Sequence, residues 1–330
     1  MTSWEKVNSN STAGRFPAAP RGLICPLITP LAPDGRIDSS ALLRMVTHVG
    51  NSADAVLVSD LQWGEGLELG IDRRIELMVA ALDILGGKRP VMVCVTGRTV
   101  EETRTLTAEL HRIAGRLGCT EKVFAVDYPL VYHGNRDLPR IITETAGRQK
   151  LPLIIGNDPE PLRILKGPAR HLNIRTSVLK ALVRIPPLRA MIFRGSVRRS
   201  LGYQKAVRAR SEFFFYDGDE AVFLNNPGMG GVVAGGSNLL PEPWKEIVRS
   251  SFNRYDTERQ FRSHQQGILE TGDLLLELHR LCRSAPAAAM KQILFQVGLI
   301  ASRQTAADAA EPGKAWRARL QAFLDRWDLA

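Results

Sequence analysis

The 330-residue chain has no apolar run that approaches the roughly 18 residues of a membrane-spanning helix, so we expect no membrane association. Residues 1–20 lack the apolar core of a secretory signal. They are rich in Ser, Asn, Pro and Gly, and we expect them to form a flexible N-terminal arm. The four cysteines lie far apart and form no C-x-x-C pair, which argues against a zinc site. We expect a cytoplasmic protein in which these cysteines are reduced: Cys25, Cys94, Cys119 and Cys282.

Lysine is scarce, since only ten of the 44 basic residues are lysines. The formal net charge is +10, but the arginines are spread along the chain and no nucleic-acid-binding motif accompanies them. We therefore expect no nucleic-acid partner, and instead a basic surface that favours small anionic ligands. The six histidines form no H-x-H or H-x-x-x-H pair, so neither a metal site nor a cofactor is expected.

What the sequence does contain is a regular alternation of short apolar segments with helical patterns. The apolar segments are continuous, as in parallel strands that are buried on both faces. Eight such units over residues 21–253 predict an α/β fold of the (β/α)8 barrel type, also called a TIM barrel. The structural alternative is a doubly wound open sheet. The predicted strands cover residues 22–29, 53–60, 90–97, 122–128, 151–157, 188–195, 212–217 and 230–236.

No strand pattern follows the eighth unit. Residues 254–330 instead contain three helical patterns, near 257–283, 286–303 and 314–327. They predict a helical C-terminal extension that packs on the barrel.

Short motifs recur in a set order near the predicted strands. The first strand and its turn read GLICPLITPLAPDGRID, LQWGE occupies 61–65, VTGRTVEET surrounds the end of the third strand, and Pro129 follows the fourth. GNDP at 156–159, DGDE at 217–220, GGVVAGGSNLLPE and AAMKQILFQVGL come next. Over roughly residues 21 to 305 these motifs resemble the dihydrodipicolinate synthase and N-acetylneuraminate lyase family. The resemblance implies a (β/α)8 barrel, a homo-oligomer, and a lyase or aldolase acting on pyruvate-type oxo-acids.

Members of that family form a Schiff base with pyruvate through a lysine on the sixth strand. The resemblance places this position at Phe193, in AMIFRGS. A shift of one residue gives Arg194, whose guanidinium stays protonated and is a poor nucleophile. The family's catalytic tyrosine falls at Val131, and the two threonines of its GTTGE motif become Gln62 and Trp63. We therefore expect the Schiff-base mechanism to be lost and Phe193 to point into the barrel.

Few side chains are placed to replace the missing catalytic groups. An active site lies where the strands of a barrel end, and among the lysines only Lys166, in the loop after the fifth strand, is on that side. Tyr132 and His133 are neighbours after the fourth strand and form an acid–base candidate.

Two acidic residues follow the second strand, Asp60 and Glu65. They can act as acid and base, or pair with arginines such as Arg98 and Arg194. We favour the pairing.

The barrel mouth is expected to bind a small anion, such as an oxo-acid, in a narrowed and more apolar pocket. Phe193 and Trp63 should partly fill the mouth, because each adds apolar volume. A carboxylate that enters such a site loses water and needs a compensating charge, which Arg194 can supply at a shallower position. The expected substrate-binding residues are Thr29, Gln62, Trp63, Asn157, Arg194 and Asn238.

Two functions stay open at this point. One is an enzyme of this family that acts on a small oxo-acid by a changed mechanism. The other is a catalytically inactive barrel that serves as a ligand-binding or partner subunit.

Overall fold

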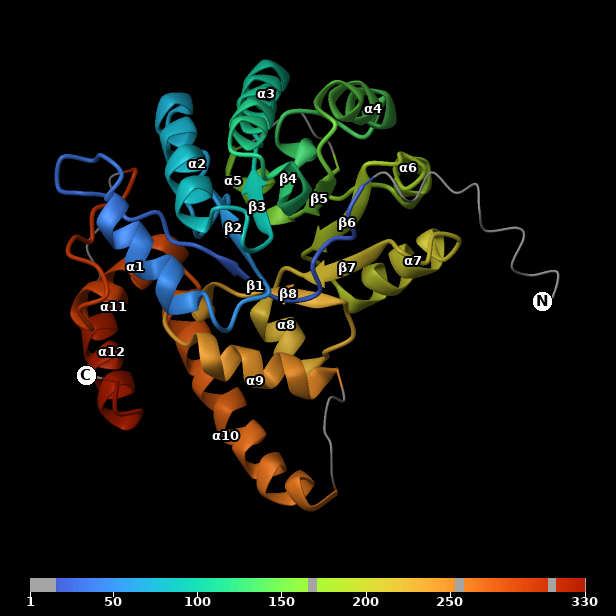
Figure 1. Ribbon diagram of the computed structural model, residues 1–330. Coiled ribbons are helices and arrows are strands. Elements are labelled where there is room, and N and C mark those ends of the chain that lie inside the picture. Colours follow the sequence, from blue (N-terminus) through green and yellow to red (C-terminus); the bar gives the residue numbers. More distant parts are fainter. Residues whose placement is uncertain (1–15, 166–170, 253–257, 308–312, 330) are drawn as a thin grey trace.

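The computed structural model describes residues 16–165, 171–252, 258–307 and 313–329. Eight parallel strands close into a barrel in sequence order, and β1 pairs in parallel with β8 (Figure 1). The closure confirms the predicted (β/α)8 barrel and rules out the open sheet. The strands are β1 (Gly22–Pro26), β2 (Ala55–Val58), β3 (Val91–Cys94), β4 (Val123–Asp127), β5 (Leu153–Asn157), β6 (Leu188–Phe193), β7 (Phe214–Asp217) and β8 (Gly231–Val233).

Helices surround the barrel because each crossover between parallel strands buries an apolar helical face against the sheet (Figure 1). Helix starts carry side-chain caps where the sequence supplies them: Asp38 accepts a hydrogen bond from the Ala41 N–H, and Thr99 accepts one from the Glu102 N–H. These helices are α1 (Ser39–Val49), α2 (Ile71–Leu85), α3 (Val100–Arg116), α4 (Leu138–Gln149), α5 (Pro159–Leu165), α6 (Thr176–Leu182), α7 (Val197–Val207), α8 (Glu220–Asn225) and α9 (Pro241–Ser251).

Three further helices follow the barrel: α10 (Glu258–Cys282), α11 (Pro286–Gln296) and α12 (Lys314–Arg326). Helix α10 contacts α8 and α9, and α11 contacts the short 3₁₀ helix Gly235–Asn238 that follows β8. Figure 1 shows α10, α11 and α12 together on one side of the barrel. The Trp316 indole N–H donates to the Leu281 carbonyl at 2.9 Å and so joins α12 to the end of α10.

None of the helices in the described ranges is long and apolar enough to cross a membrane. The division of the chain at residues 20 and 253 stays a prediction, and most of the expected N-terminal arm lies outside the described residues.

Candidate functional site

A small cavity lies at the barrel mouth, where the strands end. Its volume is about 20 Å³, which is room for about one ordered water molecule. The segments after β2, β4, β5, β6 and β7 all contribute to its wall. The lining residues are Asp60, Leu61, Gln62, Trp63, Tyr128, Asn157, Asp158, Ile192, Arg194, Gly218 and Val233, and none of them is a lysine.

Arg194 holds the polar side of this cavity together. Its Nη1 lies 3.3 Å from Oδ2 of Asp158, and its Nε and Nη2 donate to the Gly218 carbonyl at 2.9 and 2.5 Å. Gln62 Nε2 donates to the same Asp158 oxygen at 3.0 Å. The guanidinium is thus shared between the loop after β5 and the loop after β7, and 23% of the Arg194 side chain is still exposed.

Burial and charge act against each other in this pair. Burial raises the pKa of Asp158, although the nearby Arg194 guanidinium partly offsets it. Burial alone would lower the pKa of Arg194, but the surrounding acidic groups, Asp158 first and then Asp219, together raise it. Arg194 therefore stays a cation, while Asp158 is a more basic carboxylate than a surface aspartate.

Two aromatic side chains occupy most of the mouth. A Cβ at Gly235 would lie 2.0 Å from Cε2 of Trp63, and a Cβ at Gly156 would lie 2.1 Å from Cδ1 of Tyr128, so only glycine leaves room for these rings. Asp60 fixes the turn that carries the tryptophan, because its Oδ2 accepts the backbone N–H groups of residues 62 and 63, each at 3.0 Å. Trp63 is 6% exposed and Tyr128 is equally buried.

The prediction that Phe193 points into the barrel is wrong. Its ring packs on the helix side of β6, edge-to-face with Tyr203 of α7 at a centroid distance of 5.3 Å. Side chains alternate along a strand, so the neighbours Ile192 and Arg194 face the mouth cavity instead. Arg194 consequently takes the inward position at the end of β6.

The Tyr132–His133 pair is not brought together as an acid–base pair. The Tyr132 hydroxyl donates to Oδ2 of Asp127 at 2.6 Å, and His133 Nδ1 lies 2.7 Å from the Gly134 carbonyl oxygen. Asp127 faces the helix layer beside α3 and α4, and burial raises its pKa to about 6 despite the hydrogen bond from Tyr132. Val131 is buried in the 3₁₀ turn after β4. The structure assigns none of these side chains to the mouth cavity.

Of the other expected binding residues, only Asn157 lines the cavity, and its amide is already engaged. Its Nδ2 donates to Oδ1 of Asn173 at 3.0 Å. Thr29 Oγ1 donates to the Gly64 carbonyl at 2.8 Å, and Asn238 Nδ2 donates to the carbonyls of residues 26 and 235, each at 2.8 Å. Thr29 and Asn238 therefore fix loops. Lys166 lies outside the described residues.

The expected pairing of Asp60 and Glu65 with arginines is also wrong. Asp60 caps the turn described above, and Arg98 donates to the Leu67 carbonyl at 2.9 Å. Glu65 forms a salt bridge with Lys291 of α11, which is fully buried. Burial lowers the pKa of Lys291, and Glu65 opposes that shift. One sequence signal could have revealed this lysine, namely its place within a helical run, AAAMKQILF, whose other residues are apolar except Gln292.

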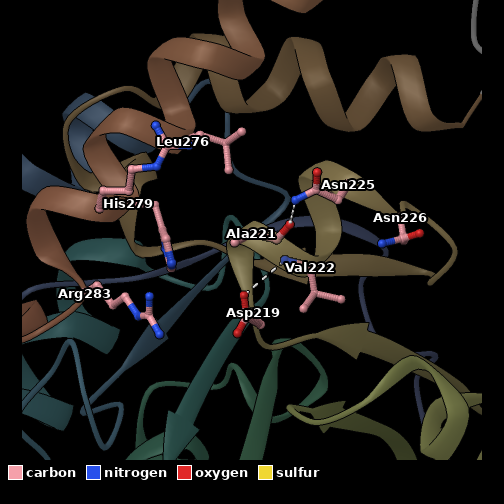
Figure 2. A pocket seen from close by; sticks show the side chains of 9 residues that line it. Asp219, Ala221, Val222, Asn225, Asn226, Leu276, His279 and Arg283 are labelled. Atoms are coloured by element: carbon pink, nitrogen blue, oxygen red, sulfur yellow. Dashed lines mark hydrogen bonds between the residues drawn. The ribbon is translucent and has the colours of Figure 1, made fainter.

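A larger hollow of about 610 Å³ lies outside the barrel between α8 and α10. Figure 2 shows His279 of α10 and Arg283, just after this helix, on one side and Asp219, at the start of α8, on the other. His279 Nδ1 lies 2.8 Å from Oε2 of Glu220, whose Oε1 accepts the Gly236 N–H at 2.7 Å. This contact joins the C-terminal helices to the loops after β7 and β8.

No cluster of three potential metal-ligating side chains occurs within the described ranges. All four cysteines are free and buried.

Comparisons with known proteins agree with this architecture. The model of the dihydrodipicolinate synthetase family matches residues 19–303. A 4-hydroxy-tetrahydrodipicolinate synthase from Thiobacillus denitrificans is 25% identical over 284 residues, covering 85% of this chain and 88% of the relative. One from a Shewanella species, strain MR-7, is 22% identical over 315 residues, covering 84% and 99%.

Solved structures share the fold at lower identity. A 4-hydroxy-tetrahydrodipicolinate synthase from Methylacidiphilum fumariolicum SolV has a TM-score of 0.77 at 22% identity, covering 93% of this chain and 96% of its own. A prophage protein of the dihydrodipicolinic acid synthase family from E. coli K12, solved in complex with pyruvate, has a TM-score of 0.75 at 17% identity, covering 94% and 99%. Since the family model spans the whole barrel together with α10 and α11, the chain belongs to the dihydrodipicolinate synthetase family.

Proposed function

We propose that the protein is a lyase or aldolase that acts on a small oxo-acid at its barrel mouth without forming a Schiff base. Membership in the dihydrodipicolinate synthetase family supports the reaction class, and the relative solved with pyruvate supports the substrate class. The observation that carries the changed mechanism is the inward position of Arg194 at the end of β6, in a mouth cavity where no lysine is among the described lining residues. A guanidinium stays protonated and cannot form the imine.

Arg194 and Asp158 supply a different chemistry. An arginine fork pairs well with a carboxylate or with an enolate oxygen. If the oxo-acid takes over the guanidinium from Asp158, that carboxylate becomes free to accept a proton from the carbon next to the carbonyl. The electron pair of the broken C–H bond forms the C=C bond of the enolate, the π pair of the C=O bond moves onto the oxygen, and Arg194 stabilises the resulting negative charge.

The size of the cavity decides where the ligand sits. A space of about 20 Å³ holds about one water, so a three-carbon acid does not fit behind Trp63. The ligand therefore binds nearer the surface, against the exposed part of Arg194, or enters after the loop that carries Gln62 and Trp63 has moved.

The same small volume favours a second function, a non-catalytic barrel that binds a ligand or partner. In the closed mouth, Arg194 already donates to Gly218 and pairs with Asp158, so it offers little to a substrate.

Proton exchange separates the two functions. Pyruvate in D₂O is followed by NMR, and an enolising enzyme replaces the methyl protons with deuterium, whereas a non-catalytic barrel does not. We expect exchange with the wild type, loss of exchange with Arg194→Ala, and unchanged exchange with Arg198→Ala, an exposed arginine on α7 that serves as the control. Exchange that survives Arg194→Ala would show that the proposed role of Arg194 is wrong. Absence of exchange and of calorimetric binding for any oxo-acid would favour the non-catalytic barrel.

The homo-oligomer and the cytoplasmic location also stay proposals. Light scattering on the purified protein measures the first directly.

A further inference from the structure

A second cleft lies on the helix side of the barrel wall, away from the mouth. It is bounded by α7, α8 and the segment that leads into β8, and its volume is about 350 Å³. This volume falls within the range of small-molecule pockets, about 300 to 1,000 Å³. Neither the mouth cavity nor the hollow between α8 and α10 contains the central residues of this cleft, which are Phe193, Leu201, Gln204 and Asp217.

The walls of this cleft are mainly apolar. Val197 and Leu201 of α7 are 49% and 52% exposed, which is unusual for large aliphatic side chains that lie one turn apart. Phe193, Val222 and Met229 complete the apolar surface. A ligand that covers these groups removes apolar area from water and gains free energy from it.

One carboxyl group stands at the base of this apolar cleft. Asp217 is paired in register with Phe193 across β6 and β7, so both side chains face the helix layer. Asp217 is 2% exposed, and its Oδ1 accepts the Asp219 N–H at 3.2 Å. In the part of the chain that the structure describes, no salt bridge or further hydrogen bond satisfies its other oxygen.

We propose that this cleft binds a small molecule with an apolar body and a single ammonium group, and that the ammonium pairs with Asp217. A buried carboxylate without a partner is costly, so a cation that reaches it is bound more strongly than the same cation in water. Ser200, Gln204 and Asn226 line the cleft and offer further oxygen acceptors for the remaining N–H groups. The formal net charge of +10 disfavours the binding of cations to the protein surface in general. Binding of an ammonium ligand in this cleft therefore depends on the Asp217 carboxylate.

The pairing makes binding depend on pH. Burial raises the pKa of Asp217 to about 7; the hydrogen bond from the Asp219 N–H and the Arg194 charge oppose this shift, while the Asp219 carboxylate adds to it. The side chains that reach the cleft from α7 and α8 are uncharged. An ammonium ligand requires the ionised carboxylate, so affinity rises as the pH increases from about 6 to about 8.

The test uses phenethylamine as the probe and phenethyl alcohol as its uncharged analogue, with binding to the full-length protein measured by calorimetry and by NMR. We expect saturable binding of the amine, and binding that is about 10- to 100-fold weaker for the alcohol and for Asp217→Asn. Leu201→Arg places a cation in the cleft and should abolish amine binding. Leu43→Arg changes an α1 leucine of the same 52% exposure and should leave it unchanged.

Thermal unfolding of each variant shows whether it is folded, and Leu201→Arg tests the cleft even if Asp217→Asn is unstable. Amine binding that survives both variants, equal binding of amine and alcohol, or no saturable amine binding would each overturn the proposal. None of these results depends on the reaction at the mouth, because the measurement contains no oxo-acid.

Discussion

The buried salt bridge between Lys291 and Glu65 connects the C-terminal helices to the loop that forms the barrel mouth. Lys291 is fully buried and also donates to the Gln304 carbonyl at 2.7 Å, while Oε1 of Glu65 accepts the Ala306 N–H at 2.8 Å. Replacing Lys291 with methionine leaves the Glu65 carboxylate buried, and among the described residues that backbone N–H is then its one donor. Breaking a buried ion pair in this way costs about 3–5 kcal/mol.

Urea unfolding measures this cost. We expect Lys291→Met to lower the free energy of unfolding by about 3–5 kcal/mol. The double variant Lys291→Met with Glu65→Gln should recover part of the loss, because it removes the unpaired charge. The control is Lys245→Met, whose partner Glu242 is 64% exposed, and its effect should stay within about 1 kcal/mol. If Lys291→Met costs no more than Lys245→Met, the extension is not fixed to the mouth through this pair.

Three further predictions concern the barrel wall. The pKa of Asp127 is raised from 3.8 to about 6, so the protonated carboxyl is favoured in the folded state. The free energy of unfolding should therefore be highest below about pH 4 and should fall as the pH rises through about 6. In thermal unfolding measured across this pH range, Asp127→Asn should not show this decrease. Trp63→Ala should lower the free energy of unfolding in urea by about 3–5 kcal/mol. Because the indole ring fills the mouth, the same change should increase the affinity for pyruvate measured by calorimetry. An unchanged affinity would contradict that role of Trp63. Phe193→Lys should lower the unfolding temperature, because it places an ammonium group against Tyr203 on the helix side of β6. For the same reason, treatment of this variant with pyruvate and borohydride should give no covalent adduct by intact mass. An adduct would show that the side chain at position 193 points into the barrel.

Much of the fold could be predicted from the sequence, because continuous apolar segments that alternate with helical patterns have few other solutions. The ranges predicted for the last three helices agree with α10 and α12. The second was predicted to reach residue 303, but α11 ends at Gln296, shortly before Gly298, which has a positive φ of 76°. Helices α5, α7 and α8 are not evident as separate helical patterns in the sequence. Two of them are only seven and six residues long, and α7 contains Gly202 and carries Val197 and Leu201 exposed rather than buried.

The site could be predicted only in part, because a one-residue shift along a strand exchanges its two faces. Gln62, Trp63, Asn157 and Arg194 do line the mouth, but Phe193 was assigned to the wrong side of β6. Tyr128 and Asp158 line the cavity too, and nothing in their local pattern distinguishes them from other residues that follow a strand.

The partner of Glu65 lies 226 residues along the chain, so local patterns could not identify it. Only tertiary packing brings Lys291 to this loop.

Covalent trapping tests the central claim most directly. The wild-type protein is incubated with pyruvate, reduced with borohydride and measured by intact mass, beside a family enzyme that carries the lysine. We predict an unmodified mass for this protein, because no lysine lines the mouth of the described barrel. An adduct of pyruvate mapped to any lysine, including Lys166, would contradict the account and restore the Schiff-base mechanism.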